Sequence, residues 1–276
     1  SEFSSKEIRE LVDSVPTGSK GQQDRVFKFI NSYCKWMMDQ ERINLNPCDS
    51  IDKDEFTINT RALKNKIIGL DKFWDVINEM ITKGCHIQLA LPLVLSRYGI
   101  YGKNAYDILH LRYEQIDKEN KTVSLYYEDG RFKTSLIVDD RFIDIIEKSK
   151  GDNKIDSKYN ATYLDTGYVI KRSSLAGDNG DIETLPGLVR RGNLAYTYVN
   201  YPSVKFNNLV KSRKIDFLLN IRKKRRINTD DVLVVMKLFD PNVSNGSYHT
   251  LVKDLEILTG EKVLYKYEKG IKLIDD

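Results

Sequence analysis

The sequence has little of what marks a disulfide-bonded, metal-binding or membrane protein. Its 276 residues include only three cysteines, Cys34, Cys48 and Cys85, and none of them lies in a Cys-x-x-Cys pair. An odd, scattered set is not a disulfide framework, and the three histidines are equally scattered, so no zinc pattern exists. No apolar run approaches the ~20 residues needed to span a bilayer, and the polar start lacks the apolar core of a signal peptide. We therefore expect a reduced, cytoplasmic protein with no metal, no cofactor and no membrane partner.

The composition is that of a folded protein, and its positive charge is concentrated in one segment. Hydrophobic residues make up 41% and charged residues 30%, with a net charge of +4. Between Lys205 and Arg226, nine cationic residues face the single acid Asp216. We call residues 205–226 the basic segment. Such a block attracts phosphates, and a solvated helix end is the alternative interpretation.

The hydrophobic pattern predicts helices, then a β-hairpin, then helices again. Alternating residues at 122–127 and 132–138, on either side of Glu128-Asp129-Gly130, predict the hairpin. Apolar residues at helical spacing predict helices over residues 6–38 with a break at 16–19, and over 61–83, 87–98 (buried), 105–113, 142–148, 204–221, 229–238 and 248–258. Thr229 is expected to cap its helix. Residues 149–202 are polar and tyrosine-rich with an exposed loop at 177–180, and residues 263–274 form a strand-like tail.

This order of elements predicts the fold class and a division into two domains. Strands and helices do not alternate along the chain, which argues against a parallel α/β fold. The expected class is mainly α with a small antiparallel β-sheet, that is, α+β. A break is expected near residues 46–58, because Asn46 precedes Pro47 and the residue before a proline avoids the helical region. We place the domains at residues 1–50 and 51–276.

The segment from Leu91 to Asp117 carries a family resemblance. Tyr98-Gly99 leads through Gly102-Lys103-Asn104 to Ala105-Tyr106-Asp107-Ile108-Leu109-His110-Leu111-Arg112, and the hairpin follows. This resembles the tyrosine recombinases (the phage integrase family), in which a buried helix, a tight turn and a Ser-Glu-Leu-Leu-type helix precede a small sheet. The resemblance covers roughly residues 25 to 260 and is specific at 91–138. It implies a helical core-binding domain, short at residues 1–50, followed by a catalytic-like domain.

The resemblance also implies that the arginines of the family's active site are missing. The first catalytic arginine lies three residues before the acid of the motif, which places it on Asn104. That arginine clamps the scissile phosphate with two hydrogen bonds, and a neutral asparagine cannot replace it. The His-x-x-Arg signature falls on Asn207 with Val210, or on Asn208 with Lys211, and neither alignment preserves the pair.

The remaining catalytic positions of the family are altered as well. The later Gly-His pair falls on Phe239-Asp240, where an aspartate would repel a phosphate. His249 occupies the expected place of the nucleophilic tyrosine. Tyr248 lies one residue short, which turns a helical side chain by about 100°. The hairpin lysine of the family corresponds to Lys133 or to the nearby Arg131.

For DNA binding, the resemblance implies a clamp of two domains that closes around a duplex. The helix at 204–221 is expected near the DNA because it occupies the position of the second motif and is basic. Cations neutralise backbone phosphates and position the protein, while base contacts in the major groove select the sequence. The residues expected to contact DNA are Lys103, Arg131, Lys133, Lys205, Lys211, Arg213, Lys214, Arg222, Lys223, Lys224, Arg225 and Arg226.

The function expected from the sequence is sequence-specific binding of double-stranded DNA by a transcriptional regulator that is not an enzyme. Within the family the pattern resembles prophage repressors, which implies binding to operator repeats and maintenance of lysogeny. Two alternatives stay open. One is an active recombinase with a displaced Tyr248, and the other is a recombinase-like module that binds a protein, such as an antagonist or a recombinase. The sequence does not predict the oligomeric state.

Overall fold

The computed structural model describes residues 4–15, 20–53, 56, 63–153, 162–174, 180–199, 201–240 and 243–264. The chain forms two compact units, residues 1–65 (unit 1) and 66–276 (unit 2). The sequence-based proposal placed the domain boundary at residues 50 and 51. The predicted loop at 177–179 and the predicted tail at 265–274 lie outside the described residues.

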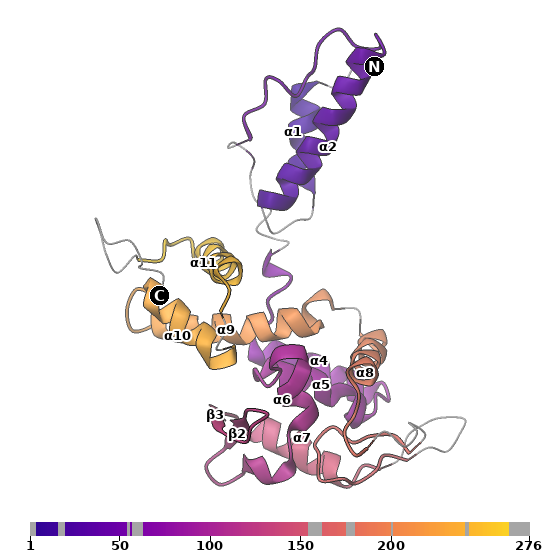
Figure 1. Cartoon of the computed structure of the whole chain (residues 1–276), viewed down its shortest axis with the longest axis vertical. Coiled ribbons are helices and arrows are strands. Elements are labelled where there is room, and N and C mark those ends of the chain that lie inside the picture. Colours follow the sequence, from indigo (N-terminus) through magenta and orange to yellow (C-terminus); the bar gives the residue numbers. More distant parts are fainter. Residues whose placement is uncertain are drawn as a thin grey trace. The chain divides into compact units, whose positions relative to one another are not determined.

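Unit 1 is built on two helices, α1 (Ser5–Ser14) and α2 (Lys20–Asp39) (Figure 1). Ser4 begins α1 with a capping box, in which its hydroxyl accepts from the Glu7 amide and the Glu7 carboxylate accepts from the Ser4 amide. Satisfying these free amides stabilises the first turn. The core of the unit consists of Ile8, Val12, Phe27, Cys34, Cys48, Ile51 and Phe56.

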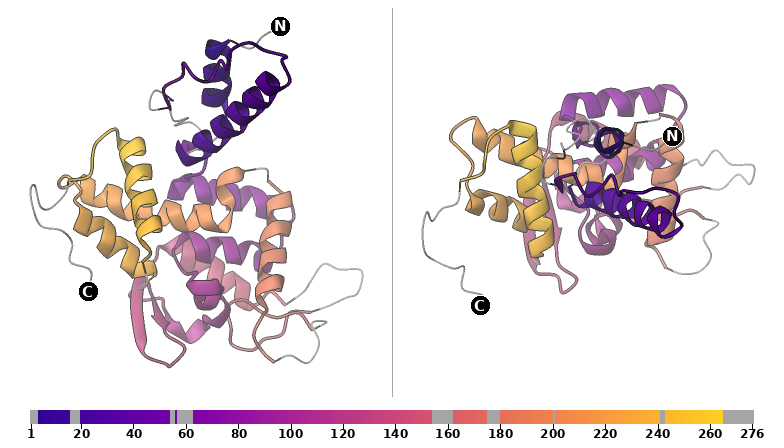
Figure 2. Two further views of the ribbon diagram at one scale, coloured as in Figure 1. Left: turned by 45° about the horizontal axis from the view of Figure 1, so that its top comes forward. Right: turned by 90° about the horizontal axis from the view of Figure 1, so that it is seen from above.

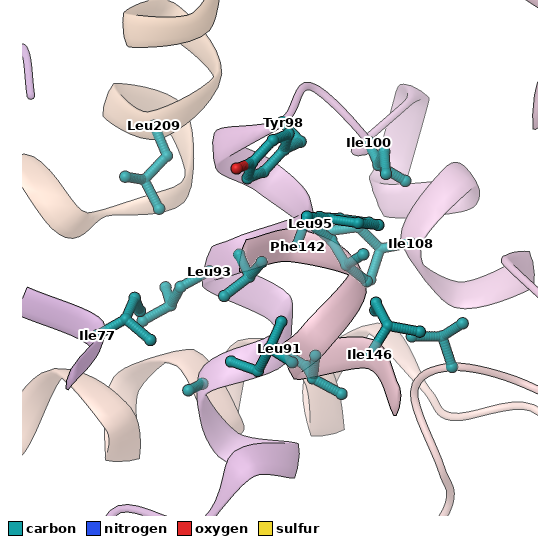
Figure 3. Close-up of a cluster of buried hydrophobic side chains, with 14 of the residues drawn as sticks. Ile77, Leu91, Leu93, Leu95, Tyr98, Ile100, Ile108, Phe142, Ile146 and Leu209 are labelled. Atoms are coloured by element: carbon teal, nitrogen blue, oxygen red, sulfur yellow. The ribbon is translucent and has the colours of Figure 1, made fainter. Parts of the chain in front are cut away.

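Unit 2 is organised around α5 (Ile87–Arg97), a helix with almost no solvent-exposed face. A helix that is apolar all round must be buried, and α5 packs against α4 (Leu70–Thr82), α6 (Tyr106–His110), α7 (Asp140–Lys150), α8 (Leu185–Thr197) and α9 (Phe206–Arg222). Figure 3 shows its side chains meeting Ile77 of α4, Ile146 of α7 and Leu209 of α9. The predicted buried helix is confirmed.

The β-hairpin and the expected fold class are also confirmed. Strands β1 (Ile116–Asp117), β2 (Thr122–Tyr126) and β3 (Phe132–Ile137) form an antiparallel sheet in the order β1-β2-β3. Val123 pairs with Leu136, and both are buried. The described residues are thus mainly helical with one small antiparallel sheet, which lies beside α7 (Figure 1).

The last three helices enclose a second hydrophobic cluster in unit 2. Helices α9, α10 (Thr229–Phe239) and α11 (Asn245–Thr259) are grouped together in both views of Figure 2. Their shared buried residues include Ile215, Leu218, Val232, Val235, Leu251 and Leu255.

The helix predicted over residues 61–83 is interrupted: Leu63 and Lys64 are helical, residues 65–69 are not, and α4 begins at Leu70. Ile68 is held in extended chain because its amide donates to Ser212 Oγ at 3.0 Å and its carbonyl accepts from Arg97 Nη2 at 3.0 Å. Neither backbone group is free to join a helix, and the partners come from α9 and α5. Local periodicity therefore could not reveal the start of α4.

The helix predicted at 105–113 is broken into three short pieces. A 3-10 turn, η2 (Lys103–Ala105), precedes α6, and a second, η3 (Tyr113–Gln115), follows it. Asn104 and Ala105 have left-handed φ angles of 52° and 60°. Leu111 is extended, and its carbonyl accepts from the Val169 amide at 2.9 Å. These two departures from helical geometry limit α6 to five residues.

Helix α8 was not predicted, and the capping residue of α10 was predicted wrongly. The inward face of α8 carries Arg191 and Gly192 beside Leu188 and Ala195, so the apolar spacing that marks a helix is interrupted. At α10 the N-cap is Asn228, whose side chain accepts from the Asp231 amide, and Thr229 is the first helical residue.

Gly99→Ala is expected to destabilise unit 2 by about 1–3 kcal/mol more than Gly84→Ala. Both glycines have left-handed backbones, with φ of +88° and +87°, so each substitution carries the same backbone penalty of about 1–2 kcal/mol. At Gly99 an added Cβ would lie 2.0 Å from Phe239 Cε1, whereas nothing lies within 4 Å at Gly84. Urea unfolding in a Trp36→Phe background, where fluorescence reports Trp74 alone, measures the difference. Equal losses would contradict the contact between the end of α5 and α10.

Candidate functional site

The turn between α5 and α6 holds the first candidate catalytic position. Asn104 is exposed, and its left-handed backbone is a conformation that asparagine tolerates better than most residues. Gly102 begins the turn with φ of +69°, and a Cβ there would lie 2.7 Å from Asp107 Cγ. The turn therefore presents a neutral amide at position 104, directly before the short helix that carries Asp107.

The hairpin lysine next to this turn is already paired. Lys133 Nζ lies 2.6 Å from Asp107 Oδ2, and the two side chains are only 9% and 3% exposed. Burial raises the pKa of Asp107, and the hydrogen bond and charge of Lys133 oppose that rise. Arg131, the other candidate for this position, is exposed and pairs with Asp129 at 2.7 Å. The one cation that the family resemblance retains is thus committed to an internal carboxylate.

The middle of α9 carries candidate residues that face the protein. Lys211 forms an ion pair with Asp254 of α11. Arg213 donates to the Ile137 carbonyl at 3.1 Å, and its guanidinium lies 5.6 Å from the Tyr98 ring centre and 4.5 Å from that of Phe217. Burial, and then the nearby Arg97, lower the pKa of Arg213. Both Lys211 and Arg213 therefore hold elements of unit 2 together.

Lys214 and Asp240, two of the later candidate positions, lie close together at the end of α10. Lys214 Nζ lies 5.7 Å from the Phe239 ring centre, and burial lowers the pKa of Lys214 while the neighbouring Asp240 raises it. Phe239 in turn contacts Gly99, five residues before Asn104. Asn207 is exposed at the start of α9, Val210 is half-buried, and Tyr248 is half-buried in the first turn of α11. The structure thus brings position 240 toward the turn that holds Asn104.

At the C-terminal end of α9, some of the five consecutive cations are paired and others are not. Arg222 pairs with Glu261 at 2.7 Å, Arg225 pairs with Asp231 at 2.6 Å, and Arg226 donates to the Lys262 carbonyl at 3.4 Å. Lys223 and Lys224 are exposed, and within the described ranges neither ammonium group has an ion-pair or hydrogen-bond partner. All five, with Leu219 and Glu261, line a surface recess of about 600 Å³.

Two further exposed lysines lie near the opposite end of α9. Lys205 precedes the first helical residue, and Lys103 belongs to the turn before α6. Their segments meet through the rings of Tyr101 and Phe206, whose centres are 5.9 Å apart. Neither lysine has a partner in the part of the chain that the structure describes. Since α9 spans 17 residues, the lysines at its two ends are about 25 Å apart along the axis.

Sequence reasoning missed the acids that neutralise the basic segment. Only Asp216 lies within residues 205–226, but the fold adds Asp231, Asp254 and Glu261 from outside it. The separation of these acids along the chain gave no local signal of the pairing. A second finding concerns ligands: within the described residues, no cluster of His, Cys, Asp and Glu could hold a metal ion, and no helix is long and apolar enough to cross a bilayer.

A buried helix, a tight turn and a small antiparallel sheet, followed by basic helices, are the arrangement expected from the resemblance to the tyrosine recombinases. Residues 75–267 match the family model described as "MrpR, C-terminal catalytic domain". The match covers more than half of the chain, which therefore belongs to this family. A crystal structure of a lambda integrase dimer bound to a COC' core site aligns with 99% of this chain and 68% of that chain, at 11% identity and a TM-score of 0.39. No curated protein matches the sequence significantly.

Lys133→Met is expected to lower the free energy of unfolding by about 3–5 kcal/mol at neutral pH, because it leaves Asp107 buried without its cation. Without Lys133 the pKa of Asp107, already raised by burial, rises further. A carboxyl group with a raised pKa in the folded state destabilises the fold above that pKa, and the penalty disappears below its unfolded value of ~4. The difference in free energy of unfolding between variant and wild type should therefore become smaller as the pH falls from neutrality toward ~4.

Lys121→Met is the matched control for that measurement. Lys121 pairs with Asp140 at 2.8 Å, but the two side chains are 45% and 76% exposed. Its loss is expected to change the free energy of unfolding by less than about 1 kcal/mol. Urea titrations of both variants at several pH values make the comparison. A buried pair would be contradicted if Lys133→Met lowered the free energy of unfolding as little as Lys121→Met does. It would also be contradicted if the loss in Lys133→Met did not vary with pH.

Proposed function

We propose that this protein is a sequence-specific, double-stranded DNA-binding regulator that lacks recombinase activity. The observation that carries the proposal is a contrast between two groups of polar residues. The candidate catalytic position is a neutral Asn104 next to a Lys133 that is neutralised by Asp107. Elsewhere on unit 2, the exposed lysines Lys103, Lys205, Lys223 and Lys224 have no acidic partner within the described residues.

The proposed lack of catalysis follows from what phosphoryl transfer requires. Cations aimed at the reacting phosphate stabilise the charge that develops in the transition state, and loss of one such group typically lowers the rate by ~10²–10³. At this site Asn104 supplies no charge, and using Lys133 would require breaking its pair with Asp107. Asp240 adds a negative charge at the position aligned with a histidine.

The proposed DNA binding rests on Lys103, Lys205, Lys223 and Lys224. These ammonium groups retain their counterions, so contact with phosphates would release those ions and favour binding. Lysines about 25 Å apart along α9 would meet phosphates separated by several base pairs, since the phosphates of one strand repeat every ~3.4 Å along the helix axis. The cations paired with Asp231, Asp254 and Glu261 contribute less, because part of their charge is already neutralised.

The finer assignment is a prophage repressor that binds operator repeats in phage DNA and maintains lysogeny. It is supported by the resemblance carried by residues 91–138 and by the proposed absence of catalysis. A repressor of this kind would be released by a protein antagonist or a recombinase partner. DNA fragments of the source replicon, retained by the protein near physiological salt and then sequenced, test this assignment. A few discrete sites sharing a motif are expected, and uniform retention of all fragments would contradict it.

The double variant Lys223→Gln/Lys224→Gln is expected to weaken binding to mixed duplex fragments and to reduce the slope of log K against log salt by ~2. The reason is the loss of two phosphate contacts at the end of α9. Lys148→Gln is the control, because Lys148 is also exposed and without a partner among the described residues but lies on α7. Binding titrations over a salt series provide both quantities. An unchanged slope in the double variant, or an equal change in the control, would show that the end of α9 does not contact the DNA.

An active recombinase is the second candidate function, because the family is described by a catalytic domain. It would require Tyr248 as the nucleophile and would leave a covalent protein–DNA adduct. Incubation with the recovered DNA sites, followed by a denaturing gel, detects such an adduct, and Tyr248→Phe is the control. An adduct that disappears in Tyr248→Phe would overturn the proposed lack of activity. The absence of DNA binding even at low salt would instead favour a protein-interaction module.

A further inference from the structure

Unit 1 brings two cysteine side chains together in its core. Cys34 lies on α2, Cys48 lies in the turn after it, and they are 7% and 3% exposed. Both side chains belong to the buried core of the unit, where Cys34 is a neighbour of the Cys48 thiol. Cys85, the third cysteine, belongs to unit 2 and is also buried, with no thiol partner among the described residues.

The turn that carries Cys48 is fixed to both helices of unit 1. Asn46 Nδ2 donates to Asn31 Oδ1 of α2 at 2.7 Å, and Asn46 Oδ1 accepts from the Cys48 amide at 3.1 Å. Ser5 Oγ, at the start of α1, donates to the Pro47 carbonyl at 2.7 Å. Asn31 lies about one helical turn before Cys34. These bonds fix the turn against the part of α2 that precedes Cys34, and the fold of the turn thus places both cysteines in the same small core.

We propose that Cys34 and Cys48 form a site of reversible disulfide formation, in which a hydroperoxide is the oxidant. One thiol loses its proton, and its sulfur attacks a peroxide oxygen. The O–O bond breaks, giving a sulfenic acid and water. The second sulfur then attacks the sulfenic sulfur, the S–S bond forms, and the hydroxyl group leaves as water with the proton of the second thiol. Two thiols and one hydrogen peroxide thus give one disulfide and two waters, and the two sulfurs supply both electrons.

The environment sets the speed of these steps. Burial raises the pKa of Cys48 to about 12, and the nearby Cys34 adds to this rise. Because the thiolate is the nucleophile, and because both side chains are buried, the first attack is slow. Oxidation is slow at neutral pH, and after the first step the neighbouring thiol is already in place to close the bond.

Closure would link α2 to the following turn and restrain unit 1. The two cysteines enclose a loop of 15 residues, and unit 1 is a small unit with a small core. Cross-linking such a loop limits the conformations of the unfolded chain. The expected consequence is a unit 1 that opens less often when oxidised, while unit 2 is unaffected.

Treatment of the folded 276-residue chain with hydrogen peroxide, followed by alkylation and tryptic digestion, tests the site. Trypsin separates the three cysteines into the peptides 29–35, 43–53 and 84–97. The expected product is the first two peptides linked, with a mass lower by two hydrogens than their sum, and a dithiol reductant releases them. Peptide 84–97 provides an internal control, because burial also raises the pKa of Cys85, to about 11, but no second thiol is present.

Three results of this experiment would overturn the proposal. One is recovery of Cys34 and Cys48 as free thiols after peroxide treatment that oxidises the urea-unfolded chain. Another is separate oxidation of each sulfur to a sulfinic acid without a link. The third is a mixture of disulfides that includes Cys85, which would indicate that the bonds form in unfolded chains.

Hydrogen exchange of the oxidised and reduced 276-residue chain provides a second readout. Peptides from α1 and α2 are expected to exchange at least several-fold more slowly after oxidation, whereas peptides from α5 and α9 keep their rates. In Cys48→Ser, peroxide should produce no such slowing. Equal exchange in the oxidised and reduced forms would show that the link, if formed, does not restrain unit 1, and the proposed effect on its opening would be abandoned.

Discussion

A guanidinium with no access to water lies at the end of the most buried helix of unit 2, and the packing of that unit depends on how its charge is met. Arg97 Nη2 donates to the Ile68 carbonyl and pairs with Asp216 of α9. Because an unpaired buried charge destabilises a fold by several kcal/mol, these two bonds fix the chain before α4 and the position of α9. Arg213 packs beside them against Tyr98 and Phe217.

The fixed position of α9 decides which of its cations are available to a phosphate. Lys211 meets Asp254 of α11, and Lys214 meets the end of α10, so the middle of the helix is used for packing. The lysines at its ends, Lys205 on one side and Lys223 with Lys224 on the other, are left exposed. In the proposed function, these separated lysines would hold a DNA backbone by its charge.

At the turn before α6, as in the middle of α9, a cation is paired inside the protein. Its left-handed residues present Asn104, and Gly102 allows the close approach of Asp107, which holds Lys133 inside the protein. A buried pair of this kind resists separation, since each partner would be left charged without compensation. The geometry that stabilises the junction of α6 and the hairpin therefore also removes a cation from the candidate site.

The sequence by itself determined the elements whose signals are local. These are the mainly apolar, buried helix α5 and the alternating hairpin, and with them the fold class. The hydrophobic pattern did not predict helix α8, because Arg191 occupies an inward position, where it pairs with Glu183. Only the tertiary structure decided which cations of the basic segment are paired and that Cys34 and Cys48 share one buried core. Periodicity reflects neighbours along the chain, whereas ion pairs and core clusters join residues that only folding brings together.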